Sequence, residues 1–195
     1  MMIGNTSKYL FAVAASALTF QGSARAEAVY EHRSYITLHG GIETVLSGSD
    51  ASETFLVGGG IGHDIQFGDV LLGIYGGLDM SEDTVINVRD LRGPKTIEFE
   101  ARPGRDFELS AKAGIRLKMI TAYVRAGYSN ARFTIDHPEY TAPFFGARNL
   151  GGGRFAGGAE VQATPSISGV VELRYSTYSY NLSRAQALGG LMLRF

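Results

Sequence analysis

Residues 107–119, Phe-Glu-Leu-Ser-Ala-Lys-Ala-Gly-Ile-Arg-Leu-Lys-Met, carry the pattern on which the fold prediction depends. All seven odd positions are apolar, and four of the six positions between them are charged. A helix would repeat its apolar residues at intervals of roughly three and four, whereas a strict period of two is typical of a β-strand. The segment is therefore predicted to be a strand with one apolar face and one charged face.

The same alternation recurs along the chain, which predicts about eight strands in all. The last of them ends on an aromatic C-terminus, with Leu191, Leu193 and Phe195 on its apolar face, as in the closing strand of a transmembrane β-barrel. An ordinary edge strand is the alternative for this segment taken alone. The other predicted strands are 35–43, 54–67, 70–80, 121–130, 154–163 and 168–176.

The connections between these strands alternate between two lengths. Short turns are expected at 68–69, 119–120 and 164–166, and longer loops at 45–52, 81–106, 133–149 and 177–185. Short turns on one side and longer loops on the other are typical of outer-membrane barrels, whereas a soluble lipocalin-like barrel would place its apolar residues inside. The predicted fold is therefore all-β: an eight-stranded antiparallel up-and-down transmembrane β-barrel. Within the longest loop, apolar alternation at 86–88 and 97–101 predicts a projecting β-hairpin.

The polar face of each strand would point into the barrel. Eight strands enclose an interior that side chains can fill, and buried charges are tolerated only when they are paired. We therefore predict a network of ion pairs in the lumen, and we expect strand glycines such as Gly60 and Gly62 to leave room beside long Arg and Lys side chains. The predicted network comprises Asp64, Asp79, Glu108, Lys112, Arg116, Arg125, Arg154, Glu160, Glu172 and Arg174.

The N-terminus resembles a secretory signal peptide over residues 1–26. Lys8 is followed by an uncharged apolar run at 9–20 and by Ala24-Arg25-Ala26, an A-x-A cleavage site. The run is shorter than the roughly 20 residues that a membrane-spanning helix needs. Cleavage would leave a barrel domain of residues 27–195 with 16 basic and 19 acidic residues, a balance that does not suggest a nucleic-acid partner.

Several stretches carry a family resemblance. Residues 104–109 (GRDFEL), 126–133 (AGYSNARF), 157–161 (GGAEV) and 171–178 (VELRYSTY), closed by 191–195 (LMLRF), resemble the opacity-protein and OmpA-like family of small outer-membrane barrels, of the porin-family or surface-antigen type. The resemblance implies a Gram-negative outer membrane, contact with its lipid and lipopolysaccharide, and barrel insertion machinery that reads Leu191, Leu193 and Phe195 as an assembly signal. OmpA itself continues into a periplasmic peptidoglycan-binding domain, whereas the given sequence ends at Phe195. The resemblance therefore does not imply anchoring to the cell wall by that route.

These features favour a structural and surface-interaction role, with a possible unknown ligand at the outer loops. A narrow pore for passive diffusion of small solutes is the alternative. A membrane enzyme is less favoured, because His32-Arg33-Ser34 precedes the first predicted strand and His63 points outward while Asp64 points inward. The chain has no cysteine, and its four histidines form no recognisable ligand set, so we expect no metal and no cofactor.

Overall fold

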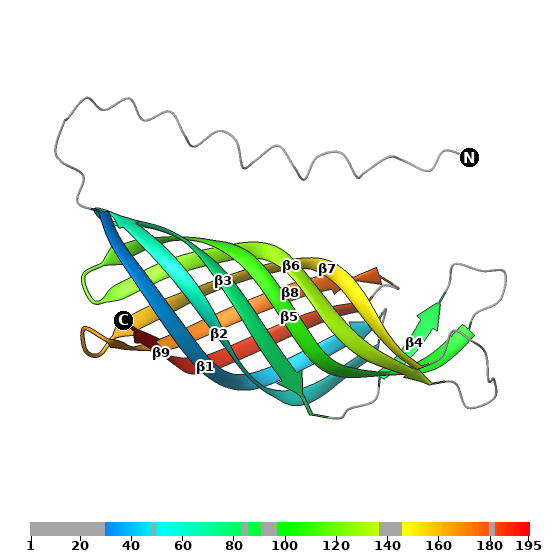
Figure 1. The fold of residues 1–195 in the computed structure, drawn as a ribbon. Helices are drawn as coiled ribbons and strands as arrows, with labels where there is room; N and C mark the ends of the chain where they lie inside the picture. Colours follow the sequence, from blue (N-terminus) through cyan, green and yellow to red (C-terminus); the bar gives the residue numbers. More distant parts are fainter. Residues whose placement is uncertain (1–29, 48–49, 83–85, 91–96, 137–145, 180–181) are drawn as a thin grey trace, which may run out of the picture.

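The computed structural model describes residues 30–47, 50–82, 86–90, 97–136, 146–179 and 182–195, which form one antiparallel β-barrel (Figure 1). The predicted signal peptide, residues 1–26, lies outside the described residues. No helix in the described part of the chain has the length and apolar character needed to cross a membrane. The strands are β1 (Tyr30–Ser47), β2 (Asp50–Phe67), β3 (Val70–Ser81), β4 (Ile86–Asp90), β5 (Ile97–Leu117), β6 (Ile120–Asp136), β7 (Gly146–Gln162), β8 (Ile167–Tyr178) and β9 (Leu182–Arg194).

Eight of these strands close the barrel, as predicted. Their order is β3-β2-β1-β9-β8-β7-β6-β5, and the pairing of β3 with β5 completes the ring. The remaining strand, β4, pairs with the outer part of β5 beyond β3, from Ile86↔Ala101 to Asp90↔Ile97. This is the projecting pairing expected for the longest loop, and Figure 1 shows β4 beyond the end of the ring that lies opposite the C-terminus.

The three short turns lie at the same end of the barrel as the C-terminus (Figure 1). Two residues connect β2 to β3, and two connect β5 to β6. Each turn contains a residue in the left-handed region, Gly68 with φ 60° and Lys118 with φ 58°. Such tight turns match the right-handed twist of the strands that they join.

All four predicted longer loops are shorter than expected, because the strands continue into them: β5 begins at Ile97, β6 ends at Asp136 and β7 begins at Gly146. β1 and β2 stay paired as far as Ser47↔Asp50, and β9 already begins at Leu182. The outward apolar pattern stops where the strands leave the lipid, so the sequence there no longer looks like a membrane strand. The inward side chains nevertheless remain packed, since Val45 and Leu182 are fully buried.

A belt of apolar side chains surrounds the outside of the barrel. Every barrel strand contributes to it, for example Leu38 in β1, Ile61 in β2 and Leu109 in β5, which are 67–71% exposed. A soluble protein rarely leaves so large a continuous apolar surface in water. Charged side chains such as Asp64 and Arg154 point the other way and are buried. This arrangement is the reverse of a lipocalin-like barrel and is that of a barrel in lipid.

Candidate functional site: the charged lumen

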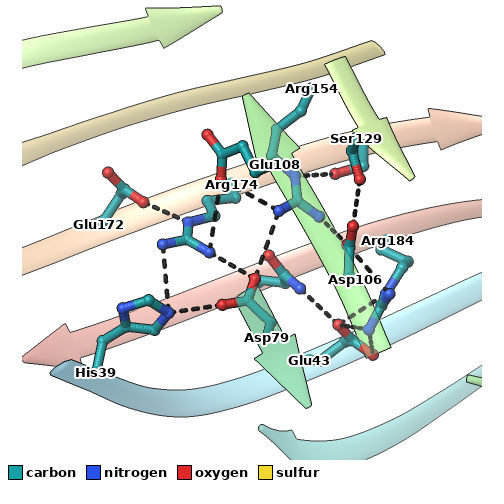
Figure 2. Close-up of polar contacts among 12 residues, drawn as sticks. His39, Glu43, Asp79, Asp106, Glu108, Ser129, Arg154, Glu172, Arg174 and Arg184 are labelled. Atoms are coloured by element: carbon teal, nitrogen blue, oxygen red, sulfur yellow. Dashed lines mark hydrogen bonds and ion pairs between the residues drawn. The ribbon is translucent and has the colours of Figure 1, made fainter. Parts of the chain in front are cut away.

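Arg154 on β7 lies at the centre of the ion pairs in the lumen (Figure 2). Its side chain is 1% exposed, and its guanidinium contacts three carboxylates: Asp106, Glu108 at 3.2 Å and Asp79 at 3.4 Å. Its Nε donates to Ser176 Oγ at 2.7 Å. A guanidinium has five N–H donors in a fixed plane, which suits it to hold carboxylates from several strands at once.

Above Arg154, toward the β4 end, a second arginine forms a similar cluster. Arg184 Nη2 donates to Glu43 Oε1 at 2.6 Å and Nη1 to Asp106 Oδ2 at 3.2 Å. Asp106 also accepts hydrogen bonds from Ser129 Oγ at 2.5 Å and Tyr178 Oη at 2.9 Å. Asp106 and Arg184 were assigned to loops in the sequence analysis, and Glu43 was placed on an inward face but not in the network. Every second side chain of a barrel strand points inward. Continuing this alternation beyond the apolar belt would have placed all three residues in the lumen.

In the middle of the barrel two arginines share the carboxylates of Asp79, Glu108 and Glu172. Arg174 contacts Asp79 at 2.8 Å and also Glu172. Arg125 contacts Glu172 at 2.6 Å and Glu108 at 3.1 Å. The imidazole of His39 lies 2.7 Å from Asp79, as Figure 2 shows. Each carboxylate therefore has more than one cationic or hydrogen-bonding partner.

The end of the lumen nearer the C-terminus holds a smaller group around Lys112. Its Nζ donates to Asp64 Oδ2 at 3.0 Å and also contacts Glu160. The ammonium lies 4.9 Å from the ring centre of Tyr35 and 4.7 Å from that of Tyr123, a cation–π geometry. Glu160 has a second cation, Arg194, whereas Lys112 is the only cation within ion-pair distance of Asp64 in the described part of the chain.

Nine of the ten residues predicted for the network are brought together in these clusters. Arg116 is not among them. It lies at the turn end, partly exposed, and donates to Gln66 Oε1 at 2.9 Å and Gln162 Oε1 at 2.6 Å. Among the described residues no carboxylate lies within ion-pair distance of it.

The inward glycines leave space for phenol rings and carboxylates, so the expectation that they adjoin Arg and Lys side chains is wrong. A Cβ at Gly60 would lie 2.3 Å from Tyr75 Oη, and one at Gly62 would lie 2.2 Å from Tyr35 Cζ. Strand glycines often mark such close approach of another group. The rings of Tyr35 and Tyr75 stack with their centres 6.5 Å apart, and a cation lies against each: Lys112 is 4.9 Å from the ring centre of Tyr35 and Arg125 is 3.9 Å from that of Tyr75.

An apolar cluster, which we call the outer cap, covers the network at the β4 end. Phe133 and Tyr178 meet edge to face with ring centres 5.8 Å apart, and Phe133 is fully buried. The two hollows that the described residues line inside the barrel are small, about 30 Å³ beside Tyr35 and Tyr75 and about 10 Å³ beside Asp64 and Gln66. The outer cap consists of Val45, Ala131, Phe133, Leu150, Tyr178 and Leu182.

The outer wall near the turn end carries a separate polar group. Ser34 lies inside β1, which begins at Tyr30, so the expectation that it precedes the first strand is wrong. Ser34 pairs with His63 across the sheet, and its Oγ lies 3.0 Å from His63 Nδ1. His63 Nε2 lies 3.3 Å from His32 Nδ1. The second ring nitrogen of His63 thus faces His32 and not a carboxylate, so the group differs from the serine–histidine–acid arrangement of a hydrolase.

The residues predicted as an assembly signal lie on the lipid face of β9. Leu191, Leu193 and Phe195 are exposed by 64%, 44% and 78%. β9 pairs with β1 from Tyr35↔Arg194 to Ser47↔Leu182, and the Phe195 N–H donates to Ser34 O at 3.0 Å. The last strand thus forms the seam with the first.

Comparison with known proteins agrees with this architecture. A family model described as the outer membrane protein beta-barrel domain matches residues 10–195. The Ail attachment invasion locus protein of Yersinia pestis, solved with the heparin analogue sucrose octasulfate, is 12% identical, with a TM-score of 0.57 over 85% of this chain and 99% of Ail. Neisserial surface protein A is 14% identical, with a TM-score of 0.56 over 83% of this chain and 97% of that protein. No curated protein sequence matches the chain.

Proposed function

Since the chain belongs to the outer membrane protein β-barrel domain family and lies in the outer membrane, we propose that it is a closed barrel that presents its outer loops at the cell surface. In this proposal the lumen is a structural core and neither a channel nor a catalytic site. The loops and the outer rim then carry whatever contact the protein makes with lipopolysaccharide or with a ligand.

The filling of the lumen is the observation that carries this proposal. Ion pairs and tyrosine rings occupy the barrel along its length, and the outer cap closes one end. The hollow of about 30 Å³ has room for roughly two to three waters and the hollow of about 10 Å³ for at most one, at roughly 10–15 Å³ per water. Solute passage would require buried ion pairs to separate, which costs several kcal/mol for each uncompensated charge.

Single-channel recording of the refolded barrel in a planar bilayer tests this proposal. We expect a flat trace at an applied potential at which a porin of the wide class, with roughly 16 to 18 strands, gives steps of current. Regular steps would instead support the alternative of a narrow pore. If such steps appeared and vanished when Arg154 was replaced, the charged lumen itself would be the conducting path.

We propose the exposed arginines at the outer end of β5 and β6 as a contact for anionic groups. Arg102, Arg105 and Arg132 are exposed there, and the Arg105 guanidinium lies 5.2 Å from the ring centre of Phe107, an aromatic of the lipid face. In this proposal the β4 end faces the outer leaflet, where lipopolysaccharide carries its phosphates, and arginine binds phosphate and sulfate with paired N–H donors. Ail, which shares the fold, was solved with a sulfated sugar.

The test is binding of purified lipopolysaccharide to the refolded barrel and to an Arg105→Gln/Arg132→Gln variant. Lys118→Gln is the matched control, because Lys118 is exposed at the opposite end of the same sheet. We expect weaker binding and a smaller salt dependence in the double variant alone. Equal loss in the control would show that net charge, and not this rim, determines binding.

We further propose that barrel insertion machinery recognises Leu191, Leu193 and Phe195. Two observations support this proposal. All three side chains are exposed, and they lie on the strand that closes the ring, without which backbone N–H and C=O groups would be left unpaired in lipid.

A further inference from the structure

Two histidines on the outer wall of the barrel point ring nitrogens at each other. His32 Nδ1 and His63 Nε2 are 3.3 Å apart, and the ring planes are tilted by 31° with centres 5.5 Å apart, so the rings meet through their nitrogens and do not stack. The two histidines come from the neighbouring strands β1 and β2. Ser34 is the direct partner of His63 across the sheet, and His32 lies two residues before Ser34 in β1.

Ser34 holds the Nδ1 side of the His63 ring, as hydrogen-bond donor in one tautomer of the ring and as acceptor in the other. The Ser34 hydroxyl lies 3.0 Å from Nδ1. When Nδ1–H donates to this oxygen, the proton of the neutral ring is on Nδ1 and the lone pair is on Nε2, which faces His32. Metal-binding histidines usually have their second nitrogen held in this way by a neighbouring acceptor. The 3.3 Å gap then lies between two ring nitrogens that can share either a proton or a metal ion.

The separation of the two nitrogens fits a metal ion. Zinc binds imidazole nitrogen at roughly 2.0–2.1 Å in tetrahedral geometry, which places two ligand nitrogens about 3.3–3.4 Å apart. We propose that His32 and His63 bind a divalent transition metal of the zinc, copper or nickel class, with Ser34 as a positioning residue. The described residues contain no group of three or more His, Cys, Asp or Glu side chains that could hold a metal, so water fills the remaining positions of this site.

The location of the pair makes the site accessible. His32 is exposed and His63 is partly exposed, and both lie near the turn end of the barrel. His39 is unsuited to this role, because its Nε2 lies 2.7 Å from Asp79 in the lumen. A metal held by two protein ligands keeps open coordination positions. Such a site exchanges its ion with the surroundings, unlike a closed structural zinc site with four protein ligands.

Copper and zinc binding by the refolded full-length barrel test the proposal. We expect one Cu²⁺ per barrel with two nitrogen couplings in its electron paramagnetic resonance spectrum, and Zn²⁺ that competes for the same site by titration calorimetry. His32→Ala and His63→Ala should each lose one nitrogen coupling and most of the affinity. Ser34→Ala should keep both couplings and bind roughly 10–100-fold more weakly. His137→Ala is the control that removes another histidine and should bind as the parent does.

Three binding results would each overturn the proposal. The first is unchanged binding in His32→Ala, the second is the absence of any copper signal above that of the double His32→Ala/His63→Ala variant, and the third is an equal loss in the His137→Ala control. A fluorophosphonate that labels Ser34 in the parent but not in His63→Ala would also overturn it, since the group would then be a nucleophile and its base. If His63→Ala failed to fold, His32→Ala would decide the question, because the His32 side chain is exposed and its removal leaves no cavity.

Discussion

Replacing Lys112 by methionine should destabilise the barrel more than the removal of Arg154, which contacts more carboxylates. Lys112 Nζ is the only hydrogen-bond partner of Asp64 Oδ2 among the described residues, and Asp64 Oδ1 has none. By contrast, the three carboxylates that contact Arg154 each keep another cation: Asp106 keeps Arg184, Glu108 keeps Arg125, and Asp79 keeps Arg174. Methionine is of similar length, so it keeps the packing between the rings of Tyr35 and Tyr123.

The expected cost follows from the burial of both partners. The side chains of Lys112 and Asp64 are 1% and 2% exposed, and removing one partner of such a pair costs about 3–5 kcal/mol. We expect the upper half of this range. Asp64→Asn alone should cost only about 1 kcal/mol, because Lys112 keeps Glu160.

The double variant Asp64→Asn/Lys112→Met separates charge from packing. It removes both members of the pair, so no uncompensated carboxylate remains at position 64, and it should be more stable than Lys112→Met. Taken together, the three variants should give a coupling free energy of about 2–3 kcal/mol.

Urea unfolding of the barrel refolded into lipid vesicles measures these differences. The chain has no tryptophan, so tyrosine fluorescence and the heat-modifiable mobility of the folded barrel in gels are suitable signals. If Lys112→Met and the double variant unfolded at the same urea concentration, Asp64 would not depend on Lys112 and the reasoning about paired lumen charges would be refuted.

Three further predictions test the packing, the lipid face and the closing strand. Gly60→Ala should cost roughly 1–3 kcal/mol because its methyl group meets a phenol ring, whereas Gly153→Ala, where a Cβ meets nothing within 4 Å, should be close to neutral by the same unfolding assay. Ile74→Arg places a charge on the lipid face in the middle of β3 and should cost about 2–4 kcal/mol, while Glu53→Arg, exposed where the outward residues are polar, should fold normally. Deleting Phe195 should lower the amount of heat-modifiable barrel in outer-membrane fractions, and normal insertion without it would remove the assembly role.

The sequence was sufficient to predict the strands wherever lipid imposes alternation. Leu109 and Ile115 were assigned to the apolar face by period two alone, and both are more than half exposed. The strand prediction failed where the lipid ends, because residues 45–52 carry no alternation of apolar and polar side chains that would indicate a strand. There the pairing of β1 and β2 depends on inward packing, which periodicity does not report.

The composition of the lumen was more predictable than its pairing. Arg154 and Asp79 could be placed inside from their phase, but they are on β7 and β3, which are not neighbours, and they meet because the barrel is narrow and its strands are tilted. Register across the lumen depends on tilt and stagger, and neither can be read from one strand. The contact of Ser34 with His63 was missed for a related reason, since β1 begins earlier than its apolar pattern does.

The outer cap has a consequence for how such a protein can change over time. Phe133 near the end of β6, Leu150 near the start of β7 and Leu182 at the start of β9 complete the interior where these strands end. Insertions or replacements beyond these strand ends leave that core intact, so they can vary in length and sequence with little effect on the free energy of unfolding of the barrel. The same property makes the barrel a suitable scaffold for displaying foreign peptides, with grafts placed beyond the cap and none placed below it.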